Sequence, residues 1–380
     1  MDQHATFSAL LAGDAPVLAL APMQDVTDLP FMKLMTAYGG ADVYYTEYFR
    51  VHGTSSLEKY ILQSITENPT GRPIVAQMIG NDIPALVRTA RELQQHNIVA
   101  VDLNLGCPAP IVYRKCAGGG LLREPKRIDS ILGALRDAVK IKFTVKTRLG
   151  FDSPQVFDEL LPIFAKHSID LLTVHGRTVM EGYRSEVHYD LIAQAVAAMP
   201  CPVLANGNIS SAPKAAEVLQ ITHARGLMIG RGAIRNPWLF RQIRQQVLVA
   251  RASRPCVSVS DQIPTETNGR DARATPSGSK DLFIPTGRDV LEYVRALYDA
   301  VCSPAVRESA QVEKMKKYLN FIGLGVEPAE PFLFQIRRVE TKADFFRVCE
   351  EFLNHDRPLP LEPAAIKMKE SGATVVSFSG

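Results

Sequence analysis

The stretch that decides the fold is residues 101–122, which read VDLNLGCPAPIVYRKCAGGGLL. The apolar run from Val99 to Leu105 is typical of a buried strand, and Gly106-Cys107-Pro108 ends it. A thiol at the carboxyl end of a buried parallel strand lies where α/β proteins carry out chemistry. Most free cysteines are packed as small hydrophobic side chains, but the position of Cys107 between Gly and Pro favours a reactive role.

The segment after Cys107 carries a second thiol and a run of glycines. Gly118 to Gly120 predict a flexible backbone that can approach its neighbours closely, and the pattern over Leu121–Lys140 predicts a helix. The sequence assigns no role to Cys116. A bystander thiol is the simplest interpretation, and trapping or oxidation of Cys107 is the alternative.

Short apolar runs alternate with helical patterns along most of the chain, which predicts a closed (β/α)8 barrel. The rival fold is a doubly wound open sheet. The barrel is favoured because no GxGxxG follows the first run and because polar residues end nearly every run. The predicted strands are Pro16–Met23, Asp42–Tyr48, Pro73–Ile79, Val99–Leu105, Lys142–Thr147, Asp170–Val174, Cys201–Ala205 and Gly226–Ile229.

Composition limits the class of protein. A chain of 380 residues predicts about two domains, and a net charge of +3 is too small to imply a nucleic-acid partner by itself. The six cysteines lack CxxC or Cys/His spacing, which argues against a metal site and against a disulfide framework. No basic leader and no apolar run of membrane-spanning length is present, so we expect a cytoplasmic protein without membrane contact.

Polar residues appear at the end of nearly every predicted strand, and in a barrel these strand ends meet at one rim. Lys146 and Arg148 are one residue apart and therefore lie on the same strand face. The last two strands end in Asn206-Gly207-Asn208 and Gly230-Arg231-Gly232, loops whose backbone N–H groups suit a phosphate. An ordinary tight turn would explain either loop alone. One phosphate, one polar ring edge and a lysine able to stabilise an anionic reduced ring together fit FMN.

Seven motifs carry a family resemblance: APMQDVTD (21–28), DLNLGCP (102–108), GGGLL (118–122), VKTRLG (145–150), VHGRT (174–178), NGN (206–208) and GRGA (230–233). In this order they resemble the tRNA-dihydrouridine synthases, strongly over residues 16–245 and more weakly over 314–354. The resemblance implies an FMN-binding TIM barrel that reduces a uridine of tRNA with electrons from NADPH.

The resemblance also implies roles for individual residues. Cys107 matches the proton donor, and Asn104, Arg148 and Tyr183 match positions that touch the target uridine. The predicted cofactor-binding residues are Pro22, Met23, Gln24, Gln77, Lys146, His175, Asn206, Gly207, Asn208, Gly230 and Arg231.

The chemistry of the reaction is consistent with these roles. Reduction of the uracil C5=C6 bond needs a hydride, which reduced flavin supplies and no side chain can. A cysteine of ordinary pKa, about 8.5, is mostly protonated at neutral pH and can donate the proton. Arg148 and Asn104 can hydrogen-bond the uracil carbonyls. The base lies inside a folded tRNA and must be splayed out to reach the flavin.

The carboxyl-terminal part is expected to hold RNA. Residues 290–323 and 329–355 predict helices, with Met315, Leu319 and Ile322 on one face. This region has nine Lys/Arg against ten Asp/Glu between 290 and 355, so a merely solvated helix face is the alternative. The motifs KKYLNFI (316–322) and LFQIR (333–337) resemble the C-type bacterial branch, whose target is uridine 16. The predicted RNA-binding residues are Lys314, Lys316, Lys317, Arg337 and Arg338.

The predicted organisation is a catalytic barrel over 1–245, a low-complexity linker over 246–289, a helical tRNA-binding domain over 290–360 and a tail over 361–380. Within the linker, 253–288 is rich in Ser, Pro, Thr and Gly and predicts a disordered insertion. We expect a monomer. Two other functions stay open: a non-catalytic tRNA-binding or folding protein, and an FMN dehydrogenase of a free pyrimidine.

Overall fold

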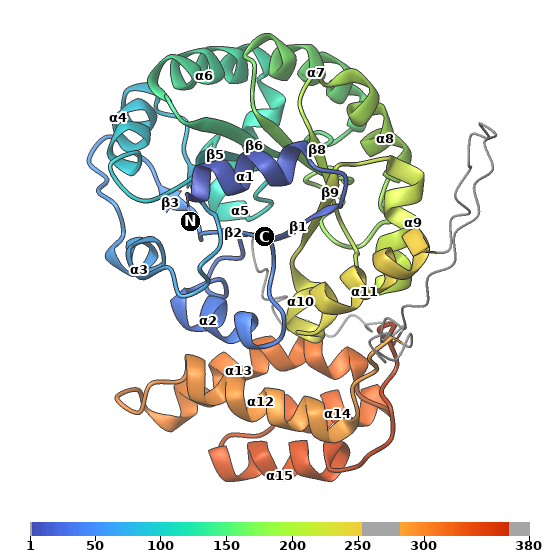
Figure 1. Ribbon diagram of the computed structural model, residues 1–380. Helices are drawn as coiled ribbons and strands as arrows, with labels where there is room; N and C mark the ends of the chain where they lie inside the picture. Colours follow the sequence, from blue (N-terminus) through green and yellow to red (C-terminus); the bar gives the residue numbers. More distant parts are fainter. Residues whose placement is uncertain (1, 253–281, 365–380) are drawn as a thin grey trace, which may run out of the picture.

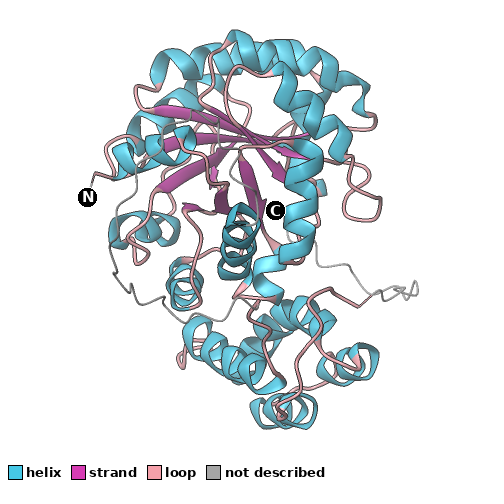
Figure 2. Cartoon of the chain, turned by 45° about the vertical axis from the view of Figure 1, so that its right-hand side comes forward, coloured by secondary structure: helices cyan, strands magenta, loops and turns pink. Residues whose placement is uncertain are grey.

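The computed structural model describes residues 2–252 and 282–364 and contains a closed parallel barrel (Figures 1 and 2). Each of the eight predicted strands is confirmed. The strands lie in the order β2-β1-β9-β8-β7-β6-β5-β4, and β2 also pairs with β4, which closes the ring. The strands are β1 (Val17–Leu20), β2 (Val43–Tyr45), β4 (Ile74–Ile79), β5 (Ala100–Leu105), β6 (Lys142–Arg148), β7 (Leu171–His175), β8 (Val203–Asn206) and β9 (Gly226–Ile229). A two-residue strand that the sequence pattern missed, β3 (Phe49–Arg50), extends the rim beside β4.

Helices surround the barrel, and the starts of α2, α4 and α9 are encoded locally. Asp28, Asp82 and Ser211 each accept a hydrogen bond from a backbone N–H of the first turn, and a proline follows within two residues. The helices that follow the strands of the barrel are α2 (Leu29–Ala37), α3 (Lys59–Glu67), α4 (Ile83–Leu93), α5 (Pro110–Tyr113), α6 (Pro125–Ala138), α7 (Phe157–Lys166), α8 (Tyr189–Ala198), α9 (Ala212–Thr222), α10 (Arg231–Arg235) and α11 (Leu239–Ala252).

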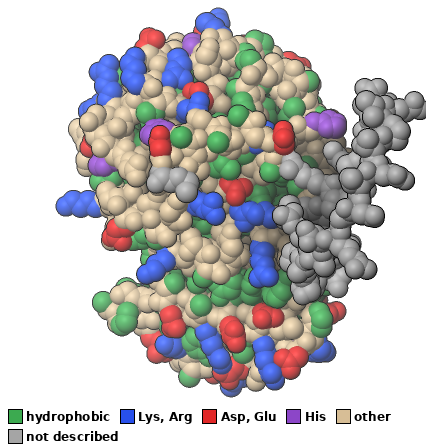
Figure 3. All heavy atoms as spheres, viewed as in Figure 1, with side chains coloured by type: hydrophobic (Ala, Val, Ile, Leu, Met, Phe, Trp, Pro, Cys, Tyr) green, Lys and Arg blue, Asp and Glu red, His purple; other side chains and the backbone are tan. Residues whose placement is uncertain are grey.

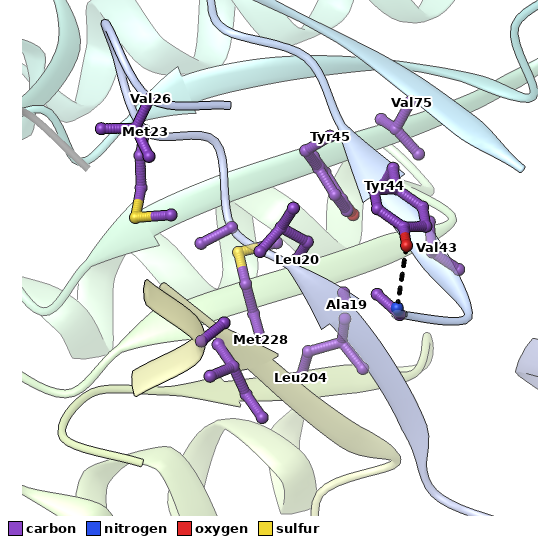
Figure 4. Packing of buried hydrophobic residues seen from close by; sticks show 14 of the residues in the cluster. Ala19, Leu20, Met23, Val26, Val43, Tyr44, Tyr45, Val75, Leu204 and Met228 are labelled. Carbon is purple, nitrogen blue, oxygen red and sulfur yellow. Dashed lines mark hydrogen bonds between the residues drawn. The ribbon is translucent and has the colours of Figure 1, made fainter. Parts of the chain in front are cut away.

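The amino end of the barrel is covered. Helix α1 (Gln3–Ala12) lies across it (Figure 1), and Arg225, directly before β9, donates to the carbonyl oxygens of Leu11 (2.8 Å) and Ala15 (2.5 Å). Apart from Lys142 at the start of β6, the eight barrel strands are buried along their whole length because helices cover one face and side chains fill the other. Figure 4 shows part of this packing, with Met228 of β9 beside Leu20 of β1. The carboxyl end of the barrel is therefore left for ligands.

The segment after β5 differs from the prediction. A 3₁₀ turn spans Gly118–Arg123, and the helix begins at Pro125 rather than at Leu121. The three glycines are buried, and a Cβ at Gly118 would lie 2.8 Å from Cδ1 of Ile79. Their close approach is as predicted, but they pack tightly against their neighbours rather than forming an open, flexible loop.

The carboxyl-terminal unit has four helices, not the two long ones that the sequence pattern predicted. They are α12 (Gly287–Val301), α13 (Glu308–Ile322), α14 (Ala329–Ile336) and α15 (Lys342–Leu353). Pro304 lies between α12 and α13, where its ring disfavours a continuous helix. Thr341 interrupts the second pattern because its side chain caps α15 by accepting from the N–H of Asp344. Met315, Leu319 and Ile322 are buried on one face of α13, as predicted.

This unit packs against the barrel through α12 and α13 (Figure 1). The Tyr293 hydroxyl donates to the carbonyl oxygen of Ile234 at 3.0 Å, and Phe31 stacks on Tyr318 with ring centroids 6.0 Å apart. The chain after α15 returns to the barrel, where the guanidinium of Arg235 donates to the carbonyl oxygen of Leu361. These contacts hold the two units in a defined arrangement.

Helix α11 continues to Ala252 and α12 begins at Gly287, so helices occupy both ends of the predicted linker 246–289. Most of the predicted insertion 253–288 lies outside the described residues, and so does the predicted tail beyond residue 364. Within the described part of the chain, no helix is long and apolar enough to cross a membrane.

Candidate functional site

Four cationic side chains gather at the carboxyl ends of β6 to β9. Lys146 and Arg148 come from β6, Arg177 follows β7 and Arg231 follows β9. Lys146, Arg148 and Arg177 are each at most 1% exposed. Burial and, after it, repulsion among the cations lower the pKa values, to about 8 for Lys146 and about 10 for Arg177. Burying several cations together costs free energy, which a bound anionic ligand would offset.

Within this cluster, Arg148 holds the loop after β5 and the loop after β7 together. Its Nε donates to the carbonyl oxygen of Gly106, and its Nη1 donates to those of Thr178 and Gly182, all at 2.9 Å. The buried Nη2 has no hydrogen-bond partner of good geometry among the described residues. The guanidinium also lies over the ring of Tyr183, 5.3 Å from its centroid. A buried donor without a partner is the kind of atom that a bound ligand satisfies.

The two glycine-containing loops lie side by side, as predicted. The Asn208 side-chain oxygen accepts from Arg177 at 3.3 Å and from Arg231 at 3.2 Å. Gly207 and Asn208 have φ angles of 127° and 45°, the left-handed region in which successive N–H groups can converge. The Asn206 amide donates to the carbonyl oxygen of Met228, so this residue shapes the loop. The pair of loops can hold a phosphate.

The other predicted cofactor residues fall into three places, and one of these is the barrel interior, where Gln77 donates to Asp102 at 2.7 Å. His175 lies near Tyr183, and burial beside Arg148 and Lys146 holds the pKa of its imidazole well below its usual range, so it is neutral. Met23, which follows Pro22 in the loop after β1, packs against Gly230, whose Cβ position would lie 3.2 Å from the methionine sulfur. These residues face the phosphate-type loops.

Gln24 points elsewhere. Its Nε2 donates to Oε2 of Glu47 at 2.8 Å and to the Tyr60 hydroxyl at 3.2 Å. Glu47 and Tyr60 line a cavity of about 750 Å³ between the barrel and α13, whose opposite wall carries Lys314 and Lys317. Gln24 is therefore not grouped with the residues at β6 to β9.

Cys107 is fully buried in the loop after β5. Its side chain packs with Tyr48, Ile79 and Ala109, and its carbonyl oxygen accepts from the N–H of Gly119 at 3.1 Å. A Cβ at Gly118 would lie 3.0 Å from Cβ of Cys107. The thiol thus has a fixed place, near enough to Lys146 and Arg148 to affect the pKa of both.

The five predicted RNA-binding residues do not form one patch. Lys314 donates to the carbonyl oxygen of Val301 at 2.9 Å and pairs with Asp28 at 3.7 Å. Lys316 pairs with Glu313 at 2.6 Å and its side chain is only 13% exposed. Arg337 and Arg338 lie at the end of α14, away from the cavity that Lys317 lines. On the face in Figure 3, cationic and acidic side chains alternate over this unit.

Sequence reasoning missed three groups of the site. Glu47 lies at the end of a predicted strand and Arg177 follows another, and this placement was the signal that could have found both. Asp102 gave no such signal, because it lies inside the predicted strand Val99–Leu105. Among residues 2–252 and 282–364, no group of three or more His, Cys, Asp or Glu side chains is arranged to hold a metal ion.

Glu47 makes a testable contribution to stability. It is 2% exposed, and burial next to Asp28 and Asp25 raises its pKa from 4.5 to about 7. The folded protein therefore binds this proton more tightly than the unfolded chain does. The free energy of unfolding of the protein should therefore fall by up to about 3 kcal/mol as the pH rises from about 4.5 to about 7.

Glu47→Gln removes the titration, so we expect a flatter pH dependence of the free energy of unfolding, measured by urea titration. Glu313→Gln, on the exposed opposite wall of the same cavity, is the matched control and should keep the wild-type slope. Equal slopes for wild type and Glu47→Gln would contradict the assignment.

Comparisons with known proteins place this geometry in a family. The sequence model described as dihydrouridine synthase matches residues 19–268. A probable tRNA-dihydrouridine synthase of Rickettsia prowazekii is 32% identical over 71% of this chain and 82% of its own length. The tRNA-dihydrouridine(16) synthase of Neisseria meningitidis is 28% identical over 88% and 94%. A tRNA-dihydrouridine synthase B of Pseudomonas syringae is 36% identical over 62% and 69%.

Proposed function

This chain belongs to the dihydrouridine synthase family and is a flavin-dependent oxidoreductase, and from that premise we propose that it reduces the C5=C6 bond of a tRNA uridine. The observation that carries the proposal is the group of buried cations at the ends of β6 to β9, next to the loop of Cys107. The glycine-containing loops after β8 and β9, the neutral His175 and the buried Lys146 suit FMN there.

The residues of this chain would divide the work as follows. Arg177, Arg231 and the loop at Asn208 would hold the FMN phosphate, and Lys146 would lie against the ring. When bound and reduced by NADPH, the flavin supplies the hydride to C6 of the uracil. Cys107 would give the proton to C5.

The uracil itself would be held by Arg148 and by the residues around Cys107. Nη2 of Arg148 makes no hydrogen bond of good geometry to the described residues, and this nitrogen can donate to a uracil carbonyl. Tyr48 and Ala109 cover the thiol of Cys107, so the splayed-out base has to displace part of this cover. Tyr183 lies between Arg148 and Arg231 and can close over the base.

The substrate would be a D-loop uridine, and we propose position 16. The Neisseria relative named for that position aligns over 88% of this chain, which extends the similarity into the helical unit. We propose that residues 290–360 contact the tRNA, with the protein acting as a cytoplasmic monomer. The cavity between α13 and the barrel rim is the space next to the site that a folded RNA would enter.

The test uses the purified full chain. A flavin absorption spectrum, NADPH oxidation and a two-hydrogen gain in mass at one uridine of unmodified tRNA support the proposal. Nuclease fragments of that tRNA then give the position. A colourless protein that binds tRNA supports the non-catalytic alternative, and reduction of free uracil or orotate without tRNA supports the free-pyrimidine alternative.

Lys317 offers a test of the RNA path. Lys314 and Lys317 both line the cavity, but Lys314, like Lys316, is engaged by protein groups. Lys317→Ala should weaken tRNA binding and make the slope of log K against log[salt] shallower by about one unit, since one phosphate contact is lost. The matched control is Lys342→Ala, an exposed lysine of the same unit. An unchanged slope in Lys317→Ala would move the RNA path away from α13.

A further inference from the structure

A layer of polar side chains crosses the barrel interior below Cys107, and its centre is Asp102. The register places Gln77, Asp102 and Thr144 side by side on β4, β5 and β6. All three are at most 1% exposed. Asp102 Oδ1 accepts from the Thr144 hydroxyl at 2.5 Å, and its Oδ2 accepts from Gln77 Nε2 at 2.7 Å.

The hydrogen bonds continue from Gln77 to the loop of Cys107. Gln77 Oε1 accepts from Asn104 Nδ2 at 2.8 Å. Asn104 Oδ1 then accepts from the backbone N–H groups of Gly106 and Cys107, both at 2.9 Å. Asp102 and Asn104 lie two residues apart on β5, so both side chains face the barrel interior. A continuous relay therefore joins the buried carboxylate to the backbone of the proton donor.

The carboxylate fixes the direction of every bond in this relay. An ionised carboxylate only accepts, so Gln77 must turn its NH₂ group toward Asp102 and its oxygen toward Asn104. Asn104 must then turn its own NH₂ group toward Gln77, which leaves its oxygen for the two backbone N–H groups. If Asn104 turned the other way, its NH₂ group would face two N–H donors and the loop would lose both bonds. Although burial raises the pKa of Asp102 to about 6, the carboxylate is the main form above neutral pH.

We propose that Asp102 is a positioning residue for Cys107, acting through Gln77 and Asn104, whose amide orientations its carboxylate fixes. The inference rests on the proposed function in taking Cys107 as the proton donor. It also has a consequence for the substrate. The Asn104 amide nitrogen carries two N–H groups, and only one of them donates to Gln77. With its amide held in this orientation, Asn104 can donate the second N–H to a ligand at the site.

The test compares three variants of the full chain at pH 8. Asp102→Leu removes the acceptor from Gln77 without leaving room for a water. Thr144→Val is the matched control, because it removes the other partner of Asp102 and leaves the relay intact. Asp102→Asn is the conservative variant: its oxygen can accept from Gln77 while its NH₂ group donates to the Thr144 hydroxyl.

We expect kcat for tRNA reduction to fall about tenfold in Asp102→Leu, a change typical of one lost hydrogen bond, with KM for tRNA and flavin content unchanged. Thr144→Val and Asp102→Asn should stay within about threefold of wild type. A fall in kcat that is equal in Asp102→Leu and Thr144→Val would show general destabilisation and overturn the proposal. If Asp102→Leu does not fold, Asp102→Val, which also lacks an acceptor and nearly fills the same space, takes its place.

A second readout does not need activity. Iodoacetamide labelling of Cys107, followed peptide by peptide, reports how firmly the loop is held, since the thiol is fully buried in the native loop. We expect labelling of Cys107 at least about fivefold faster in Asp102→Leu than in Thr144→Val. Equal labelling rates in Asp102→Leu and Thr144→Val would overturn the positioning role of Asp102, even if the chain reduces tRNA. Faster labelling in a chain that makes no dihydrouridine would uphold the relay and reject the proposed function.

Discussion

Replacing Cys107 with alanine should leave a flavoprotein that forms almost no dihydrouridine. The thiol lies in the loop after β5, next to the cations that we propose hold the flavin. Arg148 is held by backbone carbonyl oxygens, and Arg177 and Arg231 are held by the Asn208 side chain. Removal of a general acid typically costs 10²- to 10⁴-fold in rate. Flavin content and NADPH oxidation in the absence of tRNA should therefore match wild type, while product formation falls by that factor.

The chain provides its own control for this experiment. Cys116 lies nine positions further along, is exposed, and has no partner in the proposed site. Cys116→Ala should turn over tRNA at the wild-type rate. Wild-type turnover by Cys107→Ala would transfer the proton donor to another group, and a colourless Cys107→Ala protein would mean that the thiol side chain supports the flavin pocket instead.

The barrel was predictable because its signal is local. Each strand is a short apolar run that ends in a polar or glycine-containing turn, and β5 with Gly106-Cys107-Pro108 is the clearest case. The two-residue strand β3 has no such signal, because it forms by pairing with β4 at the rim. The break between α12 and α13 was present in the sequence as Pro304, but the apolar period of 3.6 continues across it and hid the break.

The site was predictable only as far as strand ends reveal it. Cys107 follows β5, Arg231 follows β9, and Lys146 lies near the carboxyl end of β6. The carboxylate of Asp102 is different, because its role arises from Gln77 and Thr144 on the neighbouring strands, which only the register brings together. For the lysines of α13, the sequence pattern predicted more than the structure contains. Their spacing predicted a cationic face, but Asp28 and Glu313 engage two of them.

The paired arginines at the loops after β7 and β9 lead to a second large effect. Arg177 and Arg231 share one acceptor, the Asn208 side chain, and repulsion from Arg231 is among the causes that lower the pKa of Arg177 to about 10. Two guanidinium groups held together in this way favour a doubly charged phosphate between them. We expect Arg177→Ala and Arg231→Ala each to weaken FMN binding roughly 10- to 100-fold, the range for a hydrogen bond to a charged group.

Riboflavin separates the phosphate from the ring in this experiment, because it carries the same ring and lacks the phosphate. Titration of the flavin-free variants by fluorescence quenching should show weakened FMN binding and unchanged riboflavin binding. Arg184→Ala, an exposed arginine of the loop after β7, is the matched control and should bind both flavins as wild type does. Equal losses for FMN and riboflavin would place the two arginines at the ring, and the loop at Asn208 would then need another anion to balance its charge.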